Sequence, residues 1–450
     1  MRDQLDNAMT GAAAAAGRYD EAIDALLRFH PRVVSAAQEL RDEAPDAPMG
    51  HALWAYLHLL STDADDLPAA RAAATALTGL EGNEREAGHA AAVAAWAAGD
   101  WDAAAARLDA VLERWPADLL ALAIGHQLDF FLGDAANLAD RPGRSLPELD
   151  PAHPHTAFVR GMHAFGLEER GSYGAAEAAG LAAVSANADD VWALHAVVHV
   201  YEMRGRVDEG LRFLAARERD WGEGNLFTVH NWWHRALYCL EAGAVDAALA
   251  VYDAHIHHPG AAGVPLELLD ASALLWRLLL DGIDVGGRFD PLADAWAAKA
   301  AESWYVFNDL HAVMAFAGAG RLDDAEAVLA RLAAESTAAA GRPTNARMTA
   351  EIGLAACRAA LAFVEGRYDD VVAGLAPIRR TLHRFGGSHA QRDALVRTLL
   401  EAALRARRVD LARALSAERV SAREASVYGW RQRAAALALA GRAGCAALEP

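Results

Sequence analysis

Histidine and glutamate side chains recur at helical spacing near the middle of the chain. His195, His199 and Glu202 lie four and three residues apart, an interval that places all three on one face of an α-helix. His230 and His234 repeat the spacing of the two earlier histidines 35 residues further along. Matched positions in adjacent helical repeats stack side by side. We therefore predict that these five side chains form a candidate catalytic acid–base cluster.

Three roles are open to this cluster. Two histidines four residues apart on a helix can bind one divalent metal ion, with a third ligand from a neighbouring helix, and His195, His199 and His234 would then be the ligands. The glutamate that directly follows the first histidine of zincin metalloproteases is missing. Imidazole with a carboxylate can also act as an acid–base pair without a metal, and a site without a cofactor is favoured. The third alternative is that the side chains only hydrogen-bond across packed helices.

Further polar side chains occupy comparable positions on neighbouring predicted helices. His163 and Glu168 precede the cluster in the chain, and Asp309 and His311 follow it. Trp233 lies inside the second histidine segment and is expected to form part of the wall of a ligand site. We predict that these five residues contribute to ligand binding.

The elements that must position these side chains are indicated by a repeated turn signature of glycine, any residue, an apolar residue and aspartate. We expect the glycine to end one helix in the left-handed conformation and the aspartate to cap the next helix. Gly205 follows the weaker copy at Gly171 by 34 residues, and Gly243 follows Gly205 by 38 residues, which suits tetratricopeptide-like helix pairs. The full copies are Gly17–Asp20, Gly99–Asp102, Gly205–Asp208, Gly243–Asp246, Gly287–Asp290, Gly320–Asp323 and Gly366–Asp369.

This repeat predicts an all-α protein of the α-α superhelix class, a tetratricopeptide-like solenoid of helical hairpins. We expect residues 1–450 to form a single continuous array of about ten pairs. A Pro- and Gly-containing segment near 134–150 is expected to interrupt the array as a loop, and residues near 407–450 are expected to cap its end.

Composition narrows the possible partners and location. The net charge of −19 opposes nucleic-acid binding, because a polyphosphate would be repelled. No apolar run approaches the length needed to span a bilayer, and no leucine-rich signal segment is expected at the amino terminus. The three cysteines are scattered and indicate no disulfide framework. We expect a cytoplasmic protein, and its alanine and arginine usage suggests a bacterial one.

Four blocks of sequence resemble the tetratricopeptide repeat protein 38 family. They are Gly161–Glu169, Trp192–Arg206, His230–His234 and Gly386–Asp393. The likeness extends over most of the chain and is strongest from Phe158 to Ile256. It implies an α-solenoid, and it adds Asn231, His389 and Arg392 to the candidate ligand-binding residues. It implies no particular reaction.

Two functions follow as expectations. In the first, a concave pocket lined by His, Glu and Asn binds a small polar metabolite, and could hydrolyse it or eliminate a group from it. The alternative is a non-catalytic scaffold whose concave face receives a protein or peptide. Peptide grooves commonly use lysine, arginine and asparagine, whereas the predicted inner helices are rich in histidine and carboxylate, which favours the first function.

Overall fold

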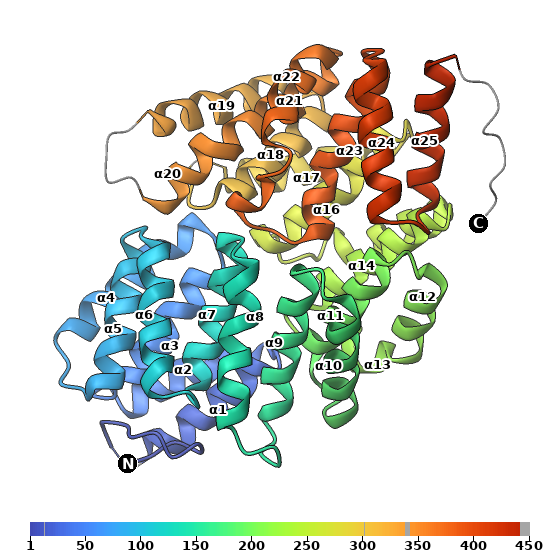
Figure 1. Ribbon diagram of the computed structural model, residues 1–450. Helices are drawn as coiled ribbons and strands as arrows, with labels where there is room; N and C mark the ends of the chain where they lie inside the picture. Colours follow the sequence, from blue (N-terminus) through green and yellow to red (C-terminus); the bar gives the residue numbers. More distant parts are fainter. Residues whose placement is uncertain (13, 301, 338–342, 442–450) are drawn as a thin grey trace. The chain divides into compact units, whose positions relative to one another are not determined.

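The computed structural model describes residues 1–450 except 13, 301, 338–342 and 442–450 (Figure 1). The described residues form α-helices with a few short 3-10 and π segments, and none of them belongs to a β-strand. The prediction of an all-α chain of helical hairpins is therefore confirmed. Within the same residues no helix is both long enough and apolar enough to cross a membrane.

The chain divides into two compact units. The first unit contains Met1–Val197, Glu218–Thr228 and Ala339–Arg347, and the second contains Val198–Arg217, Val229–Ala338 and Met348–Pro450. Helix α11 (Val191–Met203) contributes residues to both. The prediction of a single continuous array over the whole chain stays a prediction.

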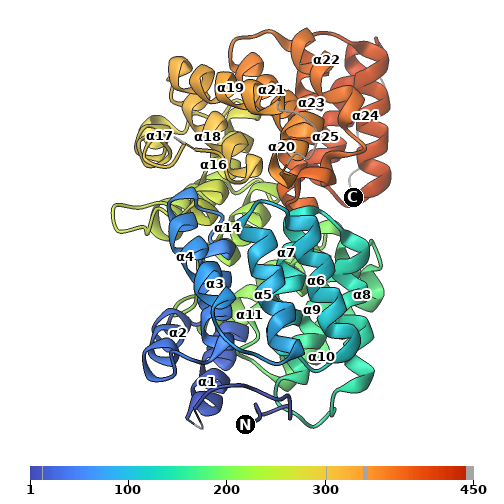
Figure 2. The same ribbon diagram turned by 90° about the vertical axis from the view of Figure 1, so that its left-hand side faces the viewer.

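The first unit is built from helices that pack against their neighbours in sequence, as is typical of hairpins with short connections. Both ribbon views show this succession (Figures 1 and 2). Alanines let the helices approach closely, and Trp96 and Trp101 fill the core with no exposed surface. The pairs are α1 (Ala15–Leu27) with α2 (Arg32–Glu43), α3 (Pro48–Leu60) with α4 (Leu67–Thr78), α5 (Glu84–Ala97) with α6 (Trp101–Arg114), α7 (Leu119–Leu132) with α8 (Ala135–Ser145), and α9 (Thr156–Glu169) with α10 (Tyr173–Ala186).

The second unit is organised around helix α16 (Pro265–Leu280). This helix packs against α17, α18 and α23, and its apolar residues occupy every face, which is the pattern of a core helix. The other helices of this unit are α12 (Val207–Ala216), α14 (Thr228–Glu241), α15 (Val245–Val251), α17 (Phe289–Ala297), α18 (Val306–Gly318), α19 (Leu322–Ser336), α21 (Leu354–Val364), α22 (Tyr368–Ile378), α23 (His389–Arg405), α24 (Val409–Ala422) and α25 (Val427–Leu439).

The turn signature is confirmed at most of its copies. Gly99, Gly205, Gly243, Gly320 and Gly366 all have a positive φ. The backbone N–H of the residue after this glycine donates to the carbonyl five residues earlier. At Gly205, for example, Arg206 N lies 2.8 Å from the Tyr201 carbonyl oxygen. This is the hydrogen-bond pattern with which a left-handed residue closes a helix.

Three details of the signature were predicted wrongly. Gly17 lies inside α1, and Gly287 has a φ of −78° because the neighbouring Gly286 takes the left-handed conformation instead. The signature aspartates do not cap: Asp208 lies in the first turn of α12, whose N-cap is Arg206. There its negative charge faces the positive end of the helix dipole.

The segment near 134–150, expected to be a loop, forms helix α8 instead. Asp134 caps it by accepting from Asn137 N, and Pro142 is tolerated near its end, where only one helical hydrogen bond is lost. The expected capping segment contains α24 and α25, and its residues 442–450 lie outside the described part of the chain.

Two turn glycines of the second unit provide a matched test of this packing. Gly205 and Gly366 have φ values of 66° and 74°. A Cβ on Gly205 would lie 2.7 Å from the Cβ of Ala425, whereas a Cβ on Gly366 would meet no atom within 4 Å. We expect Gly366→Ala to lower the free energy of unfolding by about 1–2 kcal/mol and Gly205→Ala to lower it by at least ~1 kcal/mol more. Urea unfolding would measure both, and equal losses would contradict the proposed close contact.

Candidate functional site

Helices α11, α14 and α16 bring four side chains of the second unit into a hydrogen-bonded row. The Nδ1 atom of His230 lies 2.8 Å from Asp270 Oδ2, and the Nδ1 atom of His234 lies 2.9 Å from Glu202 Oε2. The two Nε2 atoms face each other at 3.2 Å. We call Glu202, His234, His230 and Asp270 the carboxylate–histidine row.

The row depends on helical spacing within each segment. His230, Trp233 and His234 share one face of α14, and the Trp233 ring stacks on the His230 ring with centroids 5.2 Å apart. His199 lies about one helical turn before Glu202 on α11. Its ring contacts the His234 ring edge to face, with the ring centroids 4.5 Å apart. Within the second unit, the structure therefore brings together His199, Glu202, His230 and His234 of the predicted acid–base cluster.

Burial sets the protonation of this site. It lowers the pKa of His234 well below its usual value, and the charges of His199, His230 and Arg277 add to the shift. Burial also raises the pKa of Glu202, against the lowering effect of Arg423, His199 and Arg277. A low dielectric disfavours the charged form of both groups, so His234 is held neutral and Glu202 keeps its proton to a higher pH than an exposed glutamate does.

A pocket of about 170 Å³ adjoins the Glu202 end of the row. We call it the arginine pocket, because five arginines line it against four carboxylates among the residues that the structure describes. The arginines are Arg277, Arg397, Arg419, Arg423 and Arg431, and the acids are Glu202, Glu241, Asp281 and Asp393.

Three of the arginines are firmly paired. Arg419 donates to both carboxylate oxygens of Asp393 at 2.6 and 3.1 Å. Arg397 and Arg431 share the carboxylate of Asp281 at 3.0 and 2.8 Å. The ring of Tyr428 lies beneath the Arg397 guanidinium at 3.8 Å from its centroid, a cation–π contact that fixes the wall of the pocket.

Arg277 and Arg423 are held differently. Arg277 is 1% exposed and donates to the backbone carbonyls of Ala273 and Ala390 at 2.7 and 2.6 Å, with no carboxylate within ion-pair distance in the described part of the chain. Burial lowers its pKa to about 10. Arg423 lies 3.9 Å from Glu202 and 3.8 Å from Asp393, too far for direct hydrogen bonds. Among the described residues, these two guanidinium groups at the pocket thus donate no hydrogen bond to a carboxylate.

The block at Gly386–Asp393 shapes this pocket from one side. Ser388 caps α23 and Gln391 completes the capping box, while the guanidinium of Arg392 donates to the Gly387 carbonyl. The turn thereby orients Asp393 toward Arg419. Arg392 and His389 do not line the pocket, so their ligand-binding role stays a prediction.

Three further predicted ligand residues of the second unit do not line the arginine pocket. Asp309 accepts from Arg331 at 2.8 Å, and His311 Nδ1 donates to the Phe307 carbonyl at 2.7 Å. Burial lowers the pKa of His311 to about 4, with a smaller effect of the Arg277 charge. Asn231 is fully buried.

Three further predicted residues belong to the first unit. The ring of His195 lies among Phe165, Trp192 and Phe227, with centroids 4.8 to 5.1 Å away. His163 Nδ1 donates to the Ala139 carbonyl at 2.9 Å, and Glu168 is fully buried.

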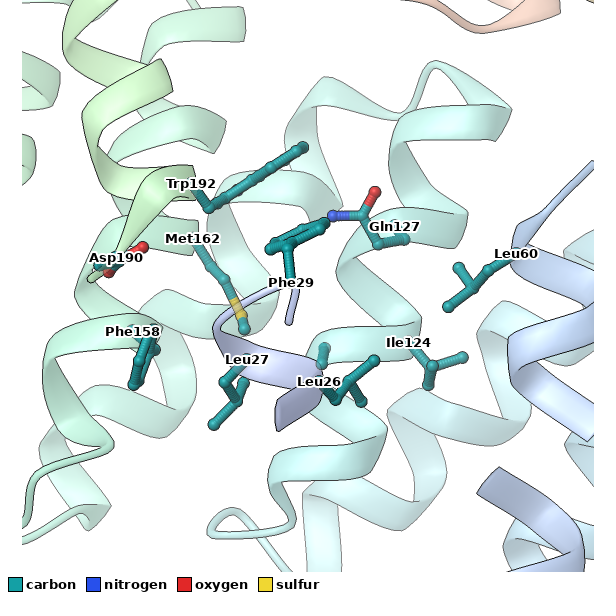
Figure 3. Close-up of a pocket in the computed structure, with 11 residues that line it drawn as sticks. Leu26, Leu27, Phe29, Leu60, Ile124, Gln127, Phe158, Met162, Asp190 and Trp192 are labelled. Carbon is teal, nitrogen blue, oxygen red and sulfur yellow. The ribbon is translucent and has the colours of Figure 1, made fainter. Parts of the chain in front are cut away.

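A small cavity of about 50 Å³ in the first unit is lined almost entirely by apolar side chains (Figure 3). Leu26, Phe29 and Ile124 belong to its wall, and Asp190 is its charged member. The cavity has room for a few water molecules and is much smaller than usual ligand pockets. It is therefore not a candidate metabolite site.

A larger hollow of about 400 Å³ lies over α19, α21 and α22 of the second unit. Its lining consists mainly of alanine and leucine, without histidine. Arg367 at its edge is ion-paired with Glu365 and Asp370. This hollow therefore offers little chemistry.

Sequence reasoning missed Asp270, Arg277 and Arg423. The first two are buried charged residues inside the mainly apolar helix α16. A charge in such a helix is buried only when it is paired or functional, so their position was a usable signal. Arg423 lies near the end of the chain in a polar segment, and nothing in its surroundings in the sequence distinguishes it.

Comparisons with known proteins yield structural likeness only. No protein-family model matches the chain. The chain is similar to a structure of Naa15/Naa10 bound to HypK-THB, with 12% identity and a TM-score of 0.24 over 96% of this chain and 61% of that one. It is also similar to the P58(IPK) TPR domain, with 12% identity and a TM-score of 0.22 over 80% of this chain and 89% of that one. The fold assignment rests on the helix pairs described above.

Asp190 provides a test of the buried electrostatics of the first unit. Its Oδ1 accepts from Ala193 N at 2.8 Å, its Oδ2 has no hydrogen-bond partner among the described residues, and burial raises its pKa to about 8. A raised carboxyl pKa stabilises the fold below the ordinary pKa near 4, and this stabilisation is lost as the pH rises toward 8. We expect Asp190→Asn, which keeps the helix cap, to be more stable than the wild type at pH 8 by about 1 kcal/mol or more.

Thermal or urea unfolding between pH 4 and 8 would measure this difference. Asp46→Asn is the control, because that side chain belongs to the same unit and is exposed, and it should not reproduce the difference. Parallel profiles for Asp190→Asn and the wild type would rule out the raised pKa.

Proposed function

We propose that the second unit binds a small carboxylate-bearing molecule in the arginine pocket. The observation that carries this proposal is the placement of Arg277 and Arg423 at a pocket of about 170 Å³. Among the described residues neither donates a hydrogen bond to a carboxylate, and Arg423 has only two long ion pairs, at 3.8 and 3.9 Å. Guanidinium groups bind carboxylates through charge-assisted and frequently bidentate hydrogen bonds. A bound carboxylate would give these guanidinium groups a close acceptor inside the pocket.

The charges of the pocket support an anionic ligand. Its five arginines exceed its four carboxylates by one, and Glu202 has a raised pKa, which increases the positive excess. The whole chain, in contrast, carries a net charge of −19, so a large polyanion is repelled. This combination favours a small anion that can enter the pocket.

The size of the pocket limits the ligand further. A cavity of about 150 Å³ accommodates a molecule of the size of benzene. A pocket of about 170 Å³ therefore suits a carboxylic acid of a few carbon atoms. Hydrolysis of such a molecule, or elimination from it, would use Glu202, which lines the pocket, and His234, which lies 2.9 Å behind it, as the acid–base pair.

The scaffold function remains the second candidate. Its supporting observation is the same pair of arginines, since a peptide carboxylate could occupy the pocket while the chain of the peptide lies outside it. We also propose that the chain belongs to the tetratricopeptide repeat protein 38 family and is located in the cytoplasm.

The proposal predicts that Arg423→Gln weakens binding of the carboxylate by ~10-fold or more, because a hydrogen bond to a charged group contributes about 1.5–3 kcal/mol. Isothermal titration with mono- and dicarboxylates of two to six carbons would measure the affinity, and the matching amides would show its dependence on charge. Arg380→Gln is the control, since that arginine is 77% exposed and lies outside the pocket.

Three outcomes would decide against this function. If no carboxylate binds saturably, or if Arg423→Gln binds as the wild type does, the pocket is not the site. Binding of extended acidic peptides without binding of the small acids would support the scaffold instead.

A further inference from the structure

We propose that His199, His230 and His234 form a binding site for one divalent transition-metal ion of the zinc class. Each of these histidines offers a ring nitrogen, and the nitrogens lie within 4.8 Å of one another. Imidazole nitrogen is a preferred ligand of Zn²⁺ and of neighbouring ions such as Co²⁺ and Ni²⁺. All three side chains belong to the second unit.

The distance between two of the nitrogens matches a shared ion. The Nε2 atoms of His230 and His234 are 3.2 Å apart. Two nitrogens bound at ~2.0–2.1 Å to one tetrahedral Zn²⁺ lie about 3.3–3.4 Å apart. The pair is therefore spaced almost as two ligands of one ion would be, before any adjustment of the side chains.

The opposite ring nitrogens have the partners that metal-bound histidines require. The Nδ1 atom of His230 lies 2.8 Å from Asp270, and that of His234 lies 2.9 Å from Glu202. Metal-binding histidines commonly donate their second N–H to a carboxylate, which fixes the tautomer and directs the other nitrogen at the ion. Here this arrangement occurs twice, on two histidines whose Nε2 atoms converge.

Packing orients the three rings. His230 is stacked on Trp233, and the His234 ring is held between the His199 and His230 rings, with centroids 4.5 and 4.8 Å away. A site assembled from rigid helices with locked rotamers binds a metal with little loss of side-chain entropy.

Charge and access are also suitable. A buried dication requires compensating negative charge, and the carboxylates of Glu202 and Asp270 together supply two negative charges when ionised. Three histidines leave the fourth tetrahedral position for water, as in zinc sites that perform catalysis. The His230 side chain is 13% exposed, which provides an approach from solvent to an otherwise buried cluster.

This inference goes beyond the proposed binding of a carboxylate. Its ligands do not line the arginine pocket, and Glu202 is the residue that both features share. Metal binding can therefore be tested in protein whose pocket has been altered by Arg423→Gln, which should retain the ion.

The test is metal analysis of the full chain. Purified protein would be treated with a chelator, reloaded with Zn²⁺ or Co²⁺ and desalted, and metal content would be measured by mass spectrometry. We expect about one ion per chain, an increase of the melting temperature on loading, and visible absorption of the Co²⁺ form typical of a tetrahedral nitrogen site. His234→Ala should abolish all three results, and Asp270→Asn should weaken the affinity by ~10- to 100-fold while retaining the ligands.

His258→Ala is the control for adventitious binding, because His258 is exposed and follows the half-buried His255 and His257 in the chain. It should leave the stoichiometry and the Co²⁺ spectrum unchanged. The proposal is overturned if the wild type retains no ion, if His258→Ala abolishes binding, or if folded His234→Ala and His199→Ala proteins bind as tightly as the wild type. Circular dichroism would establish that each variant is folded, and Asp270→Asn with unchanged affinity would also contradict the arrangement.

Discussion

The hydrogen bond between Asp270 and His230 is the interaction on which the candidate site depends. Asp270 is fully buried in the central helix of the second unit, and a carboxylate in such a position requires a polar partner. His230 fulfils this requirement from α14. The bond fixes the orientation of His230, and through its Nε2 atom the position of His234, so the row is ordered from the core of the unit outward.

Glu202 connects this ordered interior with the arginine pocket. One of its carboxylate oxygens lies 2.9 Å from His234, and the other lies 3.9 Å from Arg423. The carboxylate–histidine row and the arginine pocket are therefore neighbours in space, although Glu202 and Arg423 lie far apart in the sequence. A polar interior next to an arginine-lined hollow is more typical of a binding site than of a structural core, because structural cores minimise buried charge.

Local features of the fold could be predicted from the sequence. The glycines that end helices were found because a left-handed residue has a clear sequence preference, and the convergence of His199, Glu202, His230 and His234 followed from helical spacing. Gly17 and Gly287 show the limit of a pattern of four residues, since the same letters occur inside a helix and beside a second glycine that takes the turn conformation.

The arginine pocket could not be predicted in the same way. Arg277, Arg423 and Asp393 are separated by long stretches of chain and meet only because α16, α23 and the end of α24 pack together. No repeated spacing in the sequence predicts that these residues lie close together. The prediction that the inner helices are rich in histidine and carboxylate rested on the histidine segments and did not consider the arginines of the carboxyl-terminal helices.

The burial of helix α16 limits where insertions and deletions can be accepted during evolution. Thirteen of its sixteen residues are buried, so it has almost no solvent-facing position. Inserting or deleting one residue would rotate everything beyond that point by about 100°, turning Asp270 or Arg277 toward apolar neighbours and leucines toward the polar site. Length variation should thus be confined to the connections on either side of this helix, which gives the central segment of the chain a fixed length while its turns remain free to diverge.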